Sequence, residues 1–67
     1  MIYENIAALC EKRGVSVRRL ERETGLGNGV IGGWKRKFPR VDRLLAVADY
    51  FGVTLDELVR GAEQGAK

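Results

Sequence analysis

The stretch from Ser16 to Trp34, SVRRLERETGLGNGVIGGW, constrains the fold of this chain more than any other feature. Ser16 is a favourable N-cap, and it predicts a short helix over Val17–Thr24. Gly25 can adopt the positive φ that ends such a helix and allows a tight turn. A second short helix is expected over about residues 28–37. This layout is a helix-turn-helix, and the second helix is its candidate recognition element.

Apolar residues at helical spacing predict one helix before this stretch and two after it. The first covers Ile2–Arg13 and places four residues on one face: Ile2, Ile6, Leu9 and Cys10. The fourth covers about Val41–Phe51, and its expected inward face consists of Val41, Leu44, Leu45, Ala48 and Phe51. Thr54 and Glu57 have the spacing of a capping box, which predicts a short fifth helix with Leu55 and Leu58 inward.

These segments predict an all-α fold, a compact bundle of about five short helices. No segment shows convincing alternation of apolar and polar residues, so no strand is expected. The 67 residues suffice for one small domain, which we place at residues 1–60. Residues 61–67 are expected to form a flexible C-terminal tail.

Positive charge is concentrated directly after the candidate recognition helix. The formal net charge is +3, and residues 35–43 hold one acidic residue, Asp42, against five basic ones: Lys35, Arg36, Lys37, Arg40 and Arg43. A nucleic-acid backbone would pass at this place if the second helix contacted DNA. A solvated basic loop explains the same charges, and the charge count alone does not choose between the two.

Catalysis and metal binding have no residues to support them. The chain has no histidine and a single cysteine, Cys10, which lies on an apolar helix face and is expected to be a buried small hydrophobe. No catalytic site, metal, cofactor or small-molecule ligand is therefore expected, and the chain is not expected to be an enzyme. Nothing indicates a signal peptide or a membrane span, so we expect a cytoplasmic protein with no membrane partner.

The chain resembles the Cro and phage-repressor type of helix-turn-helix, the xenobiotic-response-element family of bacterial and phage regulators. The residues that carry this resemblance span nearly the whole chain: Ser16, Leu20, Gly25-Leu26, Ile31, Trp34, Pro39 and the run 47–58. The resemblance implies a lambda-repressor-like fold and sequence-preferring binding of double-stranded DNA by a small transcriptional regulator, expected to be a repressor. It also implies a homodimer, at least on DNA.

Several positions depart from the family pattern. Val17 stands where a DNA-contacting Gln is typical, and Glu21 stands where a small residue is usual at the helix crossing. The Glu21 carboxylate should either be partly buried and paired or point past the crossing. In the recognition segment Gly32 and Gly33 occupy the place of polar residues, so Asn28 is the main side chain left with hydrogen-bonding capacity.

The expected DNA contacts follow from this arrangement. Asn28 would contact a base edge and Val30 a thymine methyl group. The residues expected to hold phosphates are Lys35, Arg36, Lys37, Arg40, Arg43 and Arg18, and the glycines that would let the backbone approach the DNA closely are Gly29, Gly32 and Gly33. Val17 is included by its position alone, because its side chain cannot form a hydrogen bond. Because few groups can contact bases, phosphate contacts and DNA shape should dominate the affinity.

The glycines leave three hypotheses open. They let the backbone lie close to the groove, or the segment is loose when free and orders on DNA, or the segment has lost DNA reading. If Gly29, Gly32 and Gly33 all lay inside a helix, each would lower the stability of the fold by about 1 kcal/mol relative to Ala. The third hypothesis corresponds to an alternative function, a protein-interaction module of antitoxin-like or repressor-sequestering kind.

Overall fold

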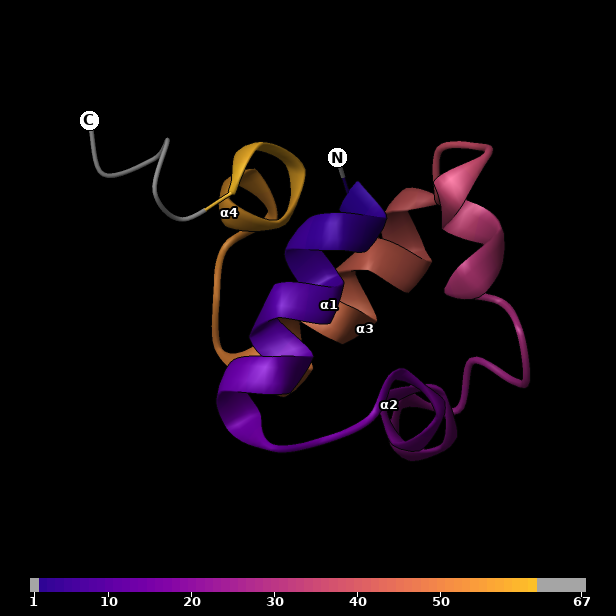
Figure 1. The fold of residues 1–67 in the computed structure, drawn as a ribbon. Helices are drawn as coiled ribbons and strands as arrows, with labels where there is room; N and C mark the ends of the chain where they lie inside the picture. The colour runs from indigo at the N-terminus through magenta and orange to yellow at the C-terminus, as the bar shows by residue number, and fades with distance from the viewer. Residues whose placement is uncertain (1, 62–67) are drawn as a thin grey trace.

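The computed structural model describes residues 2–61, which form four α-helices and one short 3-10 helix (Figure 1). The elements in chain order are α1 (Ile2–Arg13), α2 (Val17–Thr24), η1 (Gly32–Lys35), α3 (Val41–Phe51) and α4 (Leu55–Arg60). The described residues contain no strand, which confirms the all-α prediction. The tail predicted at 61–67 lies, apart from its first residue, outside the described residues.

Buried side chains from all parts of the fold form one core: α1 packs against α2, α4 and η1, and α3 packs against α2 and α4 (Figure 1). Its largest fully buried side chains come from every part of the fold: Ile6, Leu20, Ile31, Val47 and Leu58. Cys10 is 3% exposed, as expected of a small hydrophobe on this face, and burial raises the pKa of its thiol. One shared core therefore fixes all five elements relative to one another.

The predicted bounds of α2 and the predicted start of α4 are confirmed. The Ser16 hydroxyl accepts a hydrogen bond from the backbone N–H of Arg19 at 3.0 Å, and Gly25 ends α2 with φ of +76°. At α4, Thr54 and Glu57 form the reciprocal capping box that their spacing predicted. Local sequence chemistry is sufficient to place these boundaries.

The inward face of α3 differs from the prediction. Leu44, Ala48 and Phe51 are buried, but Val41 is 59% and Leu45 is 45% exposed. The prediction was wrong for these two residues because α3 packs against α2 and α4, and neither covers the far side of its first turns. The apolar stripe of α3 is wider than the surface available to bury it.

Side chains of α1 bind the carboxyl ends of α3 and α4. The Asn5 amide donates to the carbonyl oxygen of Leu58 at 2.8 Å, and the Arg13 guanidinium donates to that of Phe51 at 2.7 Å. The same guanidinium lies 5.5 Å from the centre of the Phe51 ring. Because the last carbonyls of a helix have no partner within it, each of these bonds satisfies one carbonyl at a helix end and connects segments far apart in sequence.

Candidate nucleic-acid interface

The segment expected to be the recognition helix is not an α-helix. Residues 28–31 form turns, and the helical part that follows is the single-turn 3-10 helix η1. Gly27 has φ of +97° and Gly29 has φ of +80°, values outside the right-handed helical region. The prediction of one helix over 28–37 was therefore wrong at both ends, because the helical part begins only after Gly29, at Gly32, and ends at Lys35. Because Gly29 lies in a turn, the loss of stability expected for a glycine inside a helix does not apply to it.

Two side chains attach this segment to the core. Ile31 is completely buried and Trp34 is 8% exposed, as their helical spacing predicted. The backbone N–H of Gly33 is shared between the carbonyl oxygens of Gly29 at 3.1 Å and Val30 at 3.2 Å, which is common at short helix ends. Val30 is half-buried and packs against the core, so only part of its side chain is available for a contact with DNA.

Glu21 provides the main polar contact between α2 and this segment. Only 4% of its surface is exposed, and its two carboxylate oxygens accept from two different backbone N–H groups. Oε1 accepts from Gly29 at 3.0 Å, and Oε2 accepts from Ile31 at 2.9 Å. Of the two expectations for this departure from the family pattern, the buried and paired carboxylate is confirmed.

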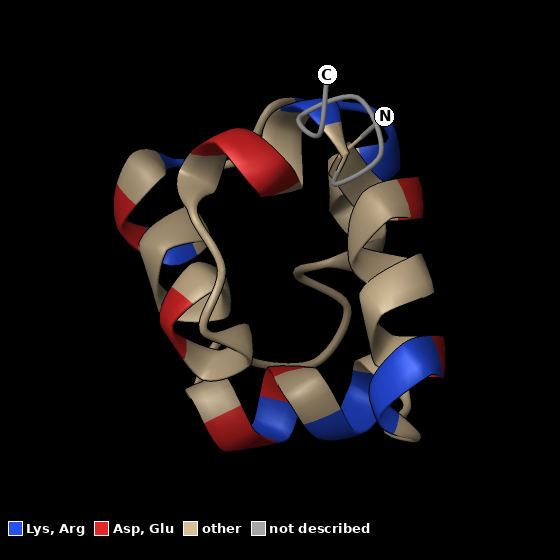
Figure 2. Ribbon diagram, turned by 90° about the vertical axis from the view of Figure 1, so that its left-hand side faces the viewer, with Lys and Arg blue, Asp and Glu red and all other residues tan. Residues whose placement is uncertain are grey.

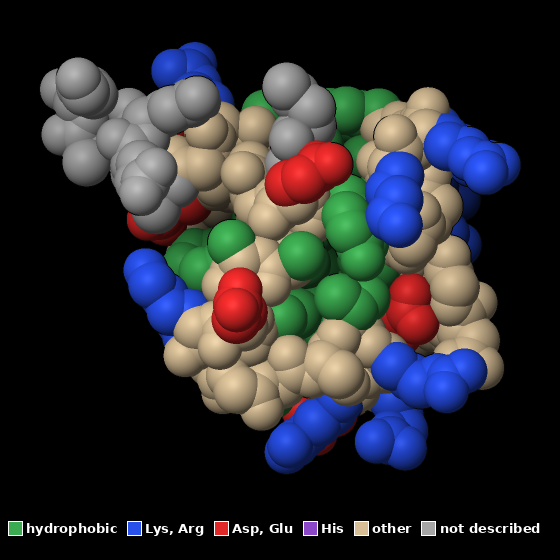
Figure 3. All heavy atoms as spheres, viewed as in Figure 1, with side chains coloured by type: hydrophobic (Ala, Val, Ile, Leu, Met, Phe, Trp, Pro, Cys, Tyr) green, Lys and Arg blue, Asp and Glu red, His purple; other side chains and the backbone are tan. Residues whose placement is uncertain are grey.

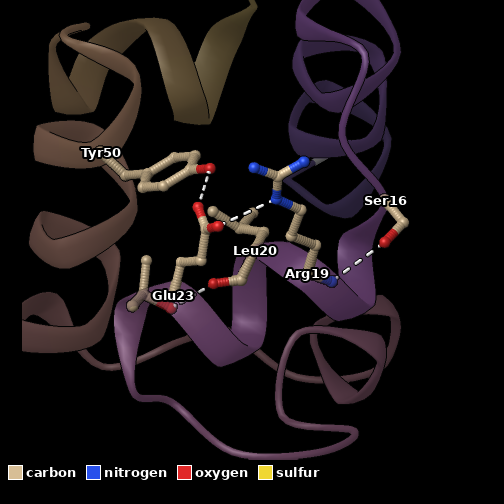
Figure 4. A network of polar contacts seen from close by, with 6 residues as sticks. Ser16, Arg19, Leu20, Glu23 and Tyr50 are labelled. Atoms are coloured by element: carbon tan, nitrogen blue, oxygen red, sulfur yellow. Dashed lines mark hydrogen bonds and ion pairs between the residues drawn. The ribbon is translucent and has the colours of Figure 1, made fainter.

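A second polar network joins α2 to α3 (Figure 4). The Glu23 carboxylate accepts from the Tyr50 hydroxyl and, at 2.9 Å, from Nε of Arg19. The bond from Tyr50 and then the bond from Arg19 lower the pKa of Glu23, while the bond to Glu23 raises the pKa of Tyr50. This network holds the exposed side of α2 against α3, and Glu21 connects the buried side of α2 to the recognition segment.

The basic residues after η1 have different surroundings. The Lys35 ammonium lies 4.7 Å from the centre of the Tyr3 ring on α1, and Nε of Arg40 lies 3.4 Å from a carboxylate oxygen of Asp42. Three exposed cations form no ion pair with any residue between 2 and 61: Arg36, Lys37 and Arg43. In the view of Figure 3, Lys and Arg side chains project around the rim while hydrophobic side chains gather at the centre.

Two further unpaired cations lie on α2. Arg18 and Arg22 line an open hollow together with Gly27 and Asn28, next to the start of the recognition segment. Neither guanidinium forms an ion pair within the described part of the chain. Figure 2 shows basic positions of α2 along the lower edge of the molecule and a second basic group at its upper edge. The sequence prediction omitted Arg22, although its spacing of four residues from Arg18 places both on one helix face.

The other predicted contact residues lie close to this surface in different environments. Asn28 and Gly29 are exposed, while Val17 is half-buried and packs against the core. Gly32 and Gly33 are half-buried, and a Cβ atom added to either would meet nothing within 4 Å. Neither has a positive φ, so the free protein does not itself require glycine at these two positions.

A family model for the Cro/C1-type HTH DNA-binding domain matches residues 5–60, most of the chain. The chain belongs to this family. It is therefore an all-helical DNA-binding domain of a small regulator, as the sequence resemblance implied. Neither the curated proteins nor the solved structures compared with it gave a significant match.

This Cro/C1-type domain thus presents its recognition segment as a glycine-containing turn followed by one 3-10 turn. Among the described residues, no group of three or more His, Cys, Asp or Glu side chains could hold a metal ion. None of the described helices is both long and apolar enough to cross a membrane. The individual contacts with bases and phosphates, and the cytoplasmic location, stay predictions.

Proposed function

We propose that this Cro/C1-type domain is a small transcriptional repressor that inserts segment 28–37 into the major groove of DNA. The observation that carries the proposal is the distribution of unpaired cations around that segment. Arg18 and Arg22 precede it on α2, Arg36 and Lys37 form its last two residues, and Arg43 follows it. Cations on both sides of a recognition element are suited to the two phosphate backbones that border a groove.

Within the groove, Asn28 is the principal group for direct readout. Its exposed amide has the donor and acceptor that adenine accepts in a bidentate contact. Val30 offers a partly exposed methyl surface for thymine, and Gly32 and Gly33 leave space for close approach. With so few base contacts, the domain should show modest sequence preference and depend on phosphates and groove shape.

The test compares binding of a fluorescent random-sequence duplex by the parent and two double variants. Arg36→Ala/Lys37→Ala removes two unpaired cations next to η1, and we expect its affinity to fall about tenfold or more at low salt. The control, Lys12→Ala/Arg60→Ala, removes the same charge from the ends of α1 and α4, on the side of Figure 1 away from η1. It should bind nearly as the parent does.

Absence of binding by the parent would contradict the proposal and favour the protein-interaction alternative. Equal losses in both variants would show that net charge matters and the position of the cations does not. A decrease confined to Arg36→Ala/Lys37→Ala supports the assigned surface.

A further inference from the structure

We infer that Glu21 is a positioning residue that sets the orientation of the DNA-contacting segment. This inference deepens the proposed function and rests on it. The carboxylate is attached to α2, and both of its hydrogen bonds end on backbone N–H groups of the recognition segment. It therefore connects the two halves of the helix-turn-helix directly.

Each of the two N–H groups that Glu21 binds belongs to the peptide bond that follows a candidate base-contacting residue. The N–H of Gly29 is part of the peptide that follows Asn28, and the N–H of Ile31 is part of the peptide that follows Val30. Asn28 and Val30 are the two residues proposed to contact bases. Because a peptide unit is planar, holding its N–H restricts the ψ angle of the residue before it. Glu21 thus fixes the backbone at both candidate base-contacting residues.

Three backbone hydrogen bonds also act on this stretch, from the N–H of Val30 to the Gly27 carbonyl at 3.4 Å and from the N–H of Gly33 to the carbonyls of Gly29 and Val30 at 3.1 and 3.2 Å. Gly27 and Gly29 both have positive φ, and glycine has wide conformational freedom when its surroundings do not restrict it. The end of the segment that holds Asn28 is exposed, and the core contact begins only at Val30 and Ile31. A carboxylate that accepts two charge-assisted bonds in a buried setting is the strongest restraint at this end.

The helix that carries Glu21 is held in place by contacts on both of its sides. Leu20 beside it is completely buried, and the Arg19–Glu23–Tyr50 network holds the outer side of α2. The Glu21 carboxylate therefore fixes the backbone of the recognition segment relative to α2. It also keeps Asn28 in register with Arg18, which lines the same hollow.

Glu21→Gln tests the inference because its electrostatic and positional effects on DNA binding have opposite signs. Loss of a negative charge near the DNA should by itself strengthen binding. Glutamine, however, has one acceptor and one NH2 donor, so one of the two N–H groups would face another donor. We expect affinity for a duplex selected from randomised DNA to fall about tenfold, as loss of one such bond implies.

The control is Glu11→Gln, which removes the same charge from an exposed position on α1. Its affinity should equal or slightly exceed that of the parent. Glu21→Asp keeps the charge and shortens the side chain, so it should also weaken binding, which charge alone does not explain. This second variant keeps the test decisive if the glutamine variant does not fold.

Amide hydrogen exchange of the free protein gives a readout independent of DNA. We expect exchange at Gly29 and Ile31 to rise about tenfold or more in the Glu21→Gln variant, while buried amides of α1 and α3 change little. Unchanged exchange at both amides, or DNA binding as strong as that of Glu11→Gln, would overturn the inference. If the parent bound no duplex, the proposed function would fail, whereas the exchange result would still test the role of the carboxylate.

Discussion

Two glutamates on α2 show how strongly a residue depends on its surroundings. Glu21 is buried and bound to backbone N–H groups, while Glu23, two residues later, is exposed and bound by two side chains. The Tyr50 hydroxyl and the Arg19 guanidinium stabilise the charged form of Glu23 and lower its pKa. The network therefore stabilises the fold only while this carboxylate is ionised.

Tyr50→Phe removes the hydroxyl, and we expect the pKa of Glu23 to rise toward its usual range. A folded-state pKa below the unfolded value means that the stabilisation exists above the unfolded pKa, about 4.3, and is lost as the pH falls through the folded value. The parent should thus be more stable than the variant at pH 7, and the difference should narrow below about pH 4. Titration of the Glu23 carboxyl by NMR and denaturation at both pH values provide the measurements.

Tyr3→Phe is the matched control for this prediction. The Tyr3 ring lies under the Lys35 ammonium, and its hydroxyl forms no hydrogen bond with another described side chain. It should leave the pKa of Glu23 unchanged. A Glu23 titration identical in the parent and in Tyr50→Phe would show that the tyrosine does not stabilise the carboxylate.

At the scale of elements, glycines in the recognition segment fall into two kinds. Gly29 adopts a φ of +80°, which residues with a Cβ atom rarely adopt. Gly33 lies in the 3-10 helix η1 without a positive φ, and a Cβ atom added to it would meet nothing within 4 Å. We expect Gly29→Ala to destabilise the protein by about 1–2 kcal/mol. Gly33→Ala should stabilise it by about 0.4–1 kcal/mol, because alanine loses less conformational entropy on folding.

Urea denaturation of the two variants distinguishes these effects. A stability gain in Gly33→Ala combined with weaker DNA binding would mean that the backbone at Gly33 approaches the DNA closely. Equal destabilisation by both substitutions would contradict the structural distinction between them. The pair thus separates a glycine required by the fold from one available for function.

Sequence patterns predicted the elements best where one residue determines the local geometry. Ser16, Gly25 and Thr54 cap or end helices through bonds with near neighbours, and all three were predicted correctly. The recognition segment was harder because its glycines are compatible with several backbone conformations, and a distant carboxylate selects among them. Its helical spacing still placed Ile31 and Trp34 correctly in the core.

The outward position of Val41 and Leu45 was not predictable from α3 alone. Both fit the apolar stripe of that helix, and their exposure depends on which side α2 and α4 cover. Similarly, the composition indicated a basic segment at 35–43 but not which of its cations are paired. The Lys35–Tyr3 contact joins residues far apart in sequence, and only the fold shows it.

For the molecule as a whole, the unpaired cations predict strong dependence of DNA binding on salt. If about four to six phosphates are contacted per chain, log K should fall against log salt concentration with a slope between about −3.5 and −5.5. Fluorescence anisotropy between about 50 and 200 mM salt measures that slope. Salt-independent affinity would contradict a phosphate-dominated interface, and Arg36→Ala/Lys37→Ala should reduce the slope by about 2.

The homodimer on DNA that the family resemblance implies is a second prediction at this scale. Two copies bound to half-sites one helical turn apart would place their recognition segments about 34 Å from each other. We expect equilibrium sedimentation of the protein with a selected palindromic duplex to show two chains per duplex. One chain per duplex at saturation would contradict the dimer and leave a single-site DNA-binding domain.

The position of Trp34 has a consequence for how this protein can be studied. It is the only tryptophan of the chain, and it lies 8% exposed inside η1, between the glycine turn and the basic residues. Its fluorescence therefore reports on this one segment, whereas far-ultraviolet circular dichroism reports mainly on the α-helices. Comparing the two signals during thermal unfolding would show whether the DNA-contacting turn melts before the rest of the domain, without any added label.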